Sequence, residues 1–204
     1  MLRVQTVLAA LVLCFGCASQ VVAGANDATD IYGKFLDTWT GKEKDPINVS
    51  ISAKAPSPEE LKEIADCAPK GTAVHWMPAE PISDLTSSIG KLSYVRLVDP
   101  DKWSPQDPSD LMARGQSVDS AVKSGFDHGL LTFSAIVFDE AQGTAAFTYS
   151  FVCGGLCGNG GTVIFHKGPS GWVQSNKQCG NWMSYIQEGG SNNSFKPKPL
   201  RGSA

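Results

Sequence analysis

Apolar and polar positions alternate most regularly in the C-terminal half of the chain. Along residues 144–152 the apolar and aromatic side chains recur at every second position, namely Ala145, Phe147, Tyr149 and Phe151. A period of two residues is typical of a strand with one buried face, so we expect these side chains to face the core. Further strand-like runs lie at 130–138, 162–167 and 172–178, with turn sequences between them. Successive runs of this kind predict a C-terminal β-meander.

A glycine- and cysteine-rich segment, Cys153-Gly-Gly-Leu-Cys157-Gly-Asn-Gly-Gly161, joins the runs at 144–152 and 162–167. Glycine adopts the positive φ values that tight hairpin turns require. Backbone N–H groups of such a segment could also bind a phosphate. However, no Lys-Ser or Lys-Thr pair follows, and no helix is expected to begin there. We therefore interpret the segment as the tip of a β-hairpin.

The N-terminal half has helical as well as strand patterns. Four apolar residues recur near helical spacing after a polar start at Thr29 or Asp30, namely Ile31, Phe35, Leu36 and Trp39. Ser57-Pro58-Glu59-Glu60 has the residues of a capping box and predicts the start of a second helix. Alternation at 46–52 and the composition of 91–98 predict two strands.

These patterns predict one α+β domain over residues 26–186, with N-terminal helices packed on a largely antiparallel sheet that ends in the meander. The 204 residues suit a single domain, and 42% hydrophobic residues are enough for a sizeable core. Residues 99–117 are polar and rich in proline, so we expect a long surface loop with one helical turn near Leu111. Residues 187–204 have little to bury and are predicted to be a disordered tail.

The first 25 residues have the features of a secretory signal peptide. Arg3 supplies a positive start, residues 4–15 are mostly apolar, and Ala23-Gly24-Ala25 offers small residues for cleavage after Ala23 or Ala25. The apolar run is shorter than the ~20 residues that span a bilayer, so no transmembrane segment is expected after cleavage. The sequence therefore predicts export to the periplasm or the extracellular medium.

A lipoprotein signal is the alternative at this end of the chain. Cys14-Phe15-Gly16-Cys17 resembles a lipidation site at Cys17. Gly16 fits that motif, but Cys14 and Phe15 stand where aliphatic and small residues are preferred. We therefore favour export without lipidation.

Four of the six cysteines lie outside the signal segment: Cys67, Cys153, Cys157 and Cys179. Export permits disulfides, and four cysteines allow three pairings. We predict Cys153–Cys157 across the hairpin tip and Cys67–Cys179 between the second helix and the end of the meander. The rival pairing joins Cys157 to Cys179 and Cys67 to Cys153.

Composition and motifs disfavour several functions. A formal net charge of −3 gives no basic surface for nucleic acid. Cys153, Cys157, His166 and Cys179 could hold a metal, but the second closely spaced cysteine pair of a structural zinc site is missing. There is no Gly-x-Ser-x-Gly motif, and the histidines His75, His128 and His166 are scattered along the chain. We therefore predict no metal, no cofactor and no catalytic residue.

The hairpin motif, followed by Gly171-Trp-Val and Trp182-Met-Ser184, resembles a family of uncharacterised exported bacterial proteins. Members share a strand, a Cys-Gly-x-Leu-Cys-Gly-x-Gly turn, a second strand, a Gly-x-Trp turn and a closing Trp-x-Ser. The resemblance covers residues 130–184 clearly. It implies the same fold and a place in the bacterial envelope, and it implies no activity or catalytic residue.

Two functions follow as hypotheses. The first is a small exported protein that acts by binding a protein or small-molecule ligand, or by a structural role, rather than by catalysis. The alternative is a secreted hydrolase with a site under the 99–117 loop that uses Asp99, Asp101 or His128. Two of these side chains within hydrogen-bond reach in one pocket would favour the hydrolase, whereas an exposed apolar or aromatic patch would favour binding.

Overall fold

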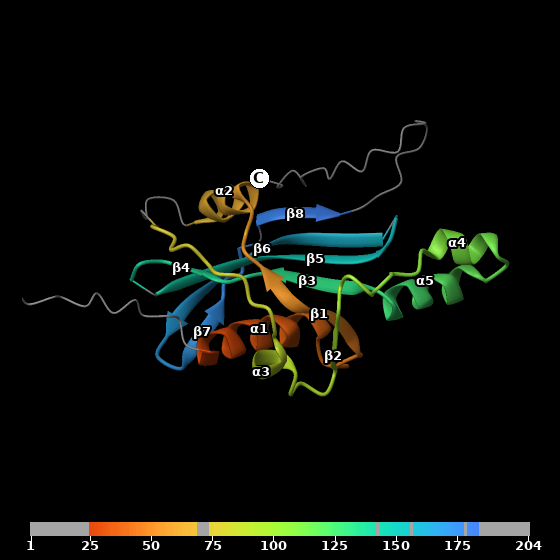
Figure 1. Ribbon diagram of the computed structural model, residues 1–204, viewed down its shortest axis with the longest axis horizontal. Coiled ribbons are helices and arrows are strands. Elements are labelled where there is room, and N and C mark those ends of the chain that lie inside the picture. The colour runs from red at the N-terminus through yellow and green to blue at the C-terminus, as the bar shows by residue number, and fades with distance from the viewer. Residues whose placement is uncertain (1–24, 69–73, 142, 156, 178, 184–204) are drawn as a thin grey trace, which may run out of the picture.

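The computed structural model describes residues 25–68, 74–141, 143–155, 157–177 and 179–183, and within them the chain forms a mixed α+β structure (Figure 1). The expected signal peptide, apart from Ala25, and the expected tail lie outside the described residues. The helices are α1 (Ala25–Thr40), α2 (Pro58–Cys67), α3 (Thr86–Ile89), α4 (Pro108–Ala113) and α5 (Val118–Asp127). The strands are β1 (Ile47–Lys54), β2 (Val95–Val98), β3 (Leu130–Ser134), β4 (Val137–Phe138), β5 (Thr144–Gly154), β6 (Cys157–Gly168), β7 (Gly171–Gln174) and β8 (Cys179–Met183).

The strands form one sheet in the order β2-β1-β3-β5-β6-β7, with β4 paired to β5 and β8 paired to β6. Strand β1 is parallel to both β2 and β3, and the other pairs are antiparallel. The parallel pairs were not predicted. They arise because helices α2 and α3, and later α4 and α5, carry the chain back to the same end of the sheet before the next strand begins.

The last strand-like run differs from its prediction. Residues 172–178 do not form one strand, because β7 ends at Gln174 and a separate strand β8 begins at Cys179. Both pair with β6, β7 near Phe165 and β8 near Gly160. Strand β6 therefore begins within the glycine-rich segment, at Cys157, rather than after it.

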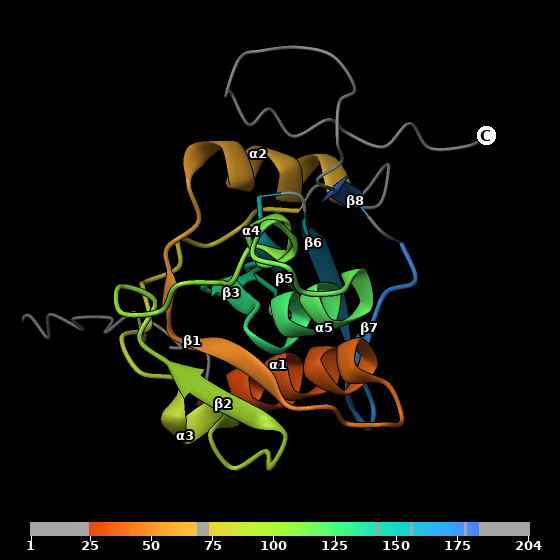
Figure 2. The same cartoon turned by 90° about the vertical axis from the view of Figure 1, so that its right-hand side faces the viewer.

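Helices α1 and α2 lie on opposite faces of the sheet (Figure 2). On the α1 face the core is aromatic. Tyr32 stacks on Phe133 with ring centroids 5.0 Å apart, and Phe35 meets Phe147 edge-on at 5.3 Å. The Tyr32 hydroxyl donates a 2.7 Å hydrogen bond to the Ser134 carbonyl, and burial raises the pKa of this phenol. The alternating positions of β5 therefore face the core as their period indicates.

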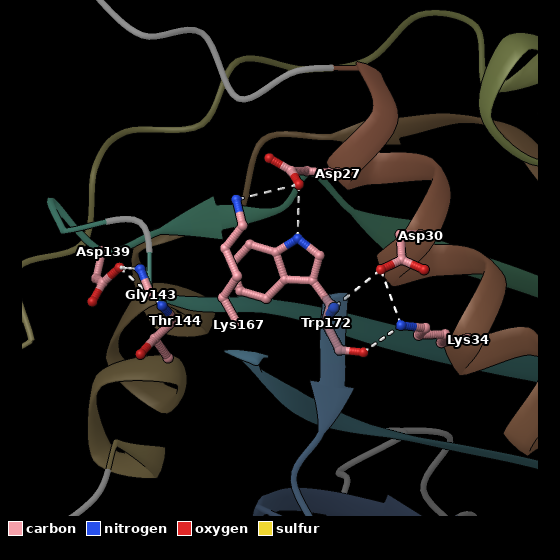
Figure 3. A network of polar contacts seen from close by, with 8 residues as sticks. All are labelled: Asp27, Asp30, Lys34, Asp139, Gly143, Thr144, Lys167 and Trp172. Atoms are coloured by element: carbon pink, nitrogen blue, oxygen red, sulfur yellow. Dashed lines mark hydrogen bonds and ion pairs between the residues drawn. The ribbon is translucent and has the colours of Figure 1, made fainter. Parts of the chain in front are cut away.

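Trp172 fastens α1 to the β6–β7 hairpin (Figure 3). Its indole Nε1 donates to Asp27 Oδ1 at 2.9 Å and its backbone N–H donates to Asp30 Oδ2 at 3.1 Å. Lys34 Nζ donates to the Trp172 carbonyl at 2.6 Å and to Asp30 at 3.0 Å. The turn needs glycine at Gly171, because its φ is +110° and a Cβ there would lie 3.0 Å from Asp30 Oδ2.

Helix α2 begins with the predicted capping box. Glu60 N–H donates to Ser57 Oγ at 3.2 Å, and Ser57 N–H donates to Glu60 Oε2 at 2.7 Å. Beyond the cap, α2 buries Ile64 and Cys67 against the second face of the sheet. This face has a much smaller apolar core than the α1 face.

Helix α4 lies within the expected 99–117 loop, where one helical turn near Leu111 was predicted, and helix α5 follows directly after that loop. Asp107 caps α4 and Ser117 caps α5 through side-chain oxygens that accept backbone N–H groups. Helix α5 was not predicted, although Ser117 and the spacing of Val118, Val122 and Phe126 are typical of a helix. Its buried residues are instead the small ones, Ala121 and Gly125.

The cysteines fall into two pairs. Cys153 and Cys157 form a disulfide at the β5–β6 tip, with their Cα atoms 5.0 Å apart. Cys67 on α2 and Cys179 on β8 are neighbouring thiols. Burial, and then the hydrogen bond with the Cys179 thiol, raise the pKa of Cys67 to about 12. The Cys67–Cys179 bridge stays a prediction.

Replacing Trp172 by alanine should destabilise the fold by about 3–5 kcal/mol, because the ring is 2% exposed and its removal leaves a cavity. Trp172→Phe keeps an aromatic ring but loses the bond to Asp27, so we expect a loss of about 1–2 kcal/mol. Urea denaturation followed by circular dichroism measures both. The matched control is Val173→Ala at the exposed neighbouring position, and an equal loss there would contradict the role of Trp172.

In exported protein, peptide mapping by mass spectrometry should find Cys67 linked to Cys179 as well as Cys153 linked to Cys157. The longer bridge closes a loop of about 113 residues and, on the chain-entropy model, stabilises by about 5 kcal/mol before strain, against about 2 kcal/mol for the short one. A peptide that joins Cys157 to Cys179 would show that the predicted pairing is wrong.

Candidate functional site

Two hollows lie on opposite faces of the sheet. The first, here called the α1-face cavity, has a volume of about 790 Å³ and is lined by Trp39, Thr40, Asp45, Pro46, Ile47, Arg96, Lys123, Phe126, Asp127, His128, Phe151 and Asn159. The second, here called the α2-face groove, has a volume of about 550 Å³ and lies between α2, strand β8 and the loop after β2. Strand alternation separates them, since Phe151 of β5 faces the first and Ser150 faces the second.

Aromatic rings form one wall of the α1-face cavity. Trp39, in the last turn of α1, lies 5.8 Å from Phe151 between ring centroids, and Phe126 of α5 stacks on Phe151 at 6.0 Å. Trp39 also meets Tyr149 edge-on at 5.2 Å. The wall continues outward, because Phe126 is 56% exposed and the α5 residues Val118 and Val122 are exposed beside it.

The rest of the α1-face cavity is polar. Asn48 is buried and donates to the carbonyls of Asp127 and Gly129 at 2.9 and 3.0 Å, which ties β1 to the end of α5. Arg96 Nη1 donates to Asn48 Oδ1 at 3.2 Å. Among the described residues no carboxylate lies within 4.0 Å of the Arg96 guanidinium. The buried Asn159 Oδ1 likewise finds no hydrogen-bond partner in the described part of the chain.

His128 lies at the end of α5 rather than in a catalytic arrangement. Its Nδ1 is 2.9 Å from the Ser124 carbonyl, and its own carbonyl accepts a 2.9 Å hydrogen bond from Trp103 Nε1. The Trp103 and His128 rings are stacked 6.3 Å apart. These contacts explain the position of His128: it follows the last turn of α5 and packs against Trp103 of the loop before α4.

The residues proposed for a hydrolase site do not converge. His128 lines the α1-face cavity, whereas Asp101 lines the α2-face groove. Asp99 forms a 2.8 Å ion pair with Lys102, which lowers the pKa of the Asp99 carboxyl. The structure therefore brings no two of these three side chains together in one pocket.

The residues considered for a metal site do not form one in the described part of the chain. Cys153 and Cys157 are joined to each other, and His166 is exposed on β6. Within the described residues no group of three histidine, cysteine, aspartate or glutamate side chains is placed to hold a metal ion. The same part of the chain contains no helix that is both long and apolar enough to cross a membrane.

Hydroxyl side chains from three adjacent strands form the base of the α2-face groove. They are Ser50 and Ser52 of β1, Thr132 and Ser134 of β3, and Thr148 and Ser150 of β5. The register places Thr132 opposite Ser150, so the hydroxyls continue from one strand to the next. The sequence shows serine and threonine at alternate strand positions, but alternation alone does not indicate that three strands bring them together in one groove.

Helix α2 places two carboxylates over this base. Glu60 accepts hydrogen bonds from Ser57 N–H and from the Thr148 hydroxyl, so both of its oxygens are fixed. Glu63, three residues later on the same side of the helix, also lines the groove. Partial burial, and then the negative charge of Glu60, raise the pKa of the Glu63 carboxyl.

Trp182 forms another wall of the groove and explains two glycines of the hairpin motif. A Cβ at Gly160 would lie 2.2 Å from Trp182 Nε1, and one at Gly158 would lie 3.5 Å from the far edge of the indole. The indole therefore lies across the bare backbone of β6. Gly158 and Gly160 therefore leave room for the Trp182 indole, in addition to their place in the hairpin.

Comparison with known proteins assigns no family: no protein-family model, curated protein or solved structure matches the chain. The candidate sites therefore depend on geometry and chemistry alone.

Proposed function

We propose that this is a small exported binding protein of the bacterial envelope or the surrounding medium, and that it acts through the α1-face cavity rather than by catalysis. The observation that carries the proposal is the aromatic wall of Trp39, Phe126 and Phe151, which ends in an exposed ring on α5. Such a wall was the feature expected of a binding protein, and Asp101 and His128 lie in different pockets.

The chemistry of the cavity favours a small molecule with a flat apolar body and an anionic group. A volume of about 790 Å³ is within the range of small-molecule sites, which are lined by aromatic side chains and a few polar groups. Flat rings pack against Phe126 and Trp39 without ordering many torsions. Arg96 offers guanidinium N–H groups to a carboxylate or phosphate, since Asn48 engages only its Nη1.

The sequence features complete this proposal. We infer that residues 1–25 direct export and are removed, and that residues 26–186 form one domain. The resemblance to exported bacterial proteins supports the same compartment. The aromatic core beneath α1 supports a rigid platform for the cavity, because four rings pack within 5.6 Å of one another in the pairs Tyr32–Phe133, Phe35–Phe133, Phe35–Phe147 and Phe133–Phe147.

The proposed ligand class can be tested with 2-naphthoate, which has a flat apolar body and a carboxylate, and with neutral 2-naphthalenemethanol. Wild-type protein should quench naphthoate fluorescence saturably. Phe126→Ala should weaken both probes about tenfold, because it removes the exposed half of the wall. Arg96→Gln should weaken only naphthoate, by about tenfold, because the charge-assisted hydrogen bonds are lost.

Lys102→Gln, which removes a surface cation outside the cavity, is the matched control for Arg96→Gln and should leave both affinities unchanged. Circular dichroism should show that all variants are folded. Equal naphthoate affinity in wild type, Phe126→Ala and Arg96→Gln would contradict the proposed site. Failure of the wild-type protein to bind either probe would contradict the ligand class.

Export is tested separately. When the full chain is expressed in a bacterial host, N-terminal sequencing of the periplasmic or secreted fraction should find a start at residue 24 or 26, because the small residues there suit cleavage. Recovery of the protein with Met1 retained would show that the signal assignment is wrong. A lipid on Cys17 would instead establish the lipoprotein alternative.

A further inference from the structure

The α2-face groove presents mainly hydrogen-bond acceptors. Ser50 Oγ donates its proton to the Ser52 carbonyl at 2.8 Å, and Thr132 Oγ1 donates to the Ser150 carbonyl at 3.2 Å. The Ser134 hydroxyl donates to the Ala135 carbonyl at 3.2 Å. A hydroxyl has one proton and two lone pairs. Ser50 Oγ and Ser134 Oγ each also accept one backbone N–H, from Ser52 and Thr148, so each keeps one lone pair, and Thr132 Oγ1 keeps two.

The charged side chains of the groove are also mainly hydrogen-bond acceptors, because most of them are carboxylates. Glu60, Glu63 and Asp101 line it, and Lys54 on the rim is the single basic residue among its described lining residues. Glu60 is anchored at the start of α2, and the Thr148 hydroxyl already donates to it. Glu63 has no ion pair among the described residues, so its carboxylate is available to a ligand.

Trp182 adds an aromatic surface beside these acceptors. The indole is held in place because β6 has no side chains at Gly158 and Gly160, the positions that it covers. A cation within about 6 Å of an indole face is attracted by the ring, most strongly to tryptophan among the aromatic residues. Carboxylates, hydroxyl lone pairs and an aromatic ring are thus combined in one groove of about 550 Å³.

We propose that the α2-face groove is a second binding site, independent of the α1-face cavity, and that it binds a small aliphatic amine in its ammonium form. An ammonium group has three N–H donors and no acceptor, which complements a groove whose hydroxyl protons are largely engaged. Its charge is opposite to that of Glu60 and Glu63. The methylene groups of the ligand pack on the Trp182 ring.

A neutral oligosaccharide would suit the groove less well. Sugar hydroxyl and ring oxygens need donors as well as acceptors, and the engaged protons of Ser50, Thr132 and Ser134 are not offered to the ligand. The like charges of Glu60 and Glu63 would also remain unbalanced beside an uncharged sugar.

Spermidine is the probe, and isothermal titration calorimetry on the full exported chain measures its binding. Glu63→Gln should weaken the affinity about fivefold to tenfold, because one ion pair at a partly exposed site is lost. Trp182→Ala should weaken it by a similar factor. Raising NaCl from about 20 mM to about 300 mM should weaken wild-type binding and change Glu63→Gln less.

Two further variants distinguish electrostatics from general damage. Glu59→Gln removes a carboxylate from the same helix outside the groove and should leave the affinity unchanged. Lys54→Gln removes the rim cation and should tighten spermidine binding about twofold or more, because a repulsive charge is lost. A merely structural role of these side chains would not produce opposite effects at Glu63 and Lys54.

Saturable binding of cellotriose without binding of spermidine would overturn the proposal in favour of a neutral sugar site. Equal spermidine affinity in wild type and Glu63→Gln would overturn the assignment to this groove, and absence of spermidine binding would overturn the ligand class. Because Phe126→Ala leaves the groove intact, it should bind spermidine as the wild type does, so this proposal and the α1-face cavity can fail separately.

Discussion

The structure depends on the packing of α1 against the aromatic face of the sheet. Trp172 and the β6–β7 turn hold the first turns of α1 through Asp27, Asp30 and Lys34, and the rings of β3 and β5 hold its middle. The aromatic residues of β3 and β5 that face α1 are thereby placed in an apolar core, and the residues between them face the other side of the sheet. Trp39, at the far end of the same helix, then lies where the core ends and the α1-face cavity begins.

The strand period of two also explains why the protein has two hollows of different chemistry. Phe151 and Asn159 face α1, whereas Ser150 and Gly160 face α2 and strand β8. Helix α2 is only ten residues long and buries Ile64 and Cys67 near one end of its face, so the hydroxyl-bearing part of the sheet faces the groove rather than an apolar helix surface. A longer apolar helix on this side would have required apolar residues in place of these serines and threonines. The serines and threonines on this face of the sheet and the short helix α2 are therefore consistent with each other, since neither requires an extended apolar layer between them.

Sequence patterns predicted the elements better than their arrangement. The capping box at Ser57 fixed the start of α2, and the alternation at 144–152 predicted both β5 and the face that is buried. The parallel pairing of β1 with β2 and β3 was not predictable from alternation, since the period of two is the same in either direction. The groove was missed because Ser50, Thr132 and Ser150 are far apart in the sequence and only the register brings them together. Trp182 stands out in the sequence only within the closing Trp-x-Ser motif, because its position on Gly158 and Gly160 depends on the β6–β8 pairing.

The hairpin tip connects the disulfide to the wall of the α1-face cavity. A Cβ at Gly125 would lie 2.6 Å from Pro108 and 3.1 Å from the Cys153 carbonyl, so α5 can approach the tip this closely only with glycine there. Asp107, which caps α4, also accepts a hydrogen bond from Gly155 N–H on the other side of the tip. Gly129, just after α5, allows the Phe151 ring to approach, since a Cβ there would lie 2.4 Å from it. The C-terminal end of helix α5 is thus fixed by the cysteine hairpin and by β5. Because Phe126 is the next residue after Gly125, these contacts set where the exposed ring meets Phe151, and the geometry of the cavity wall follows from the hairpin motif.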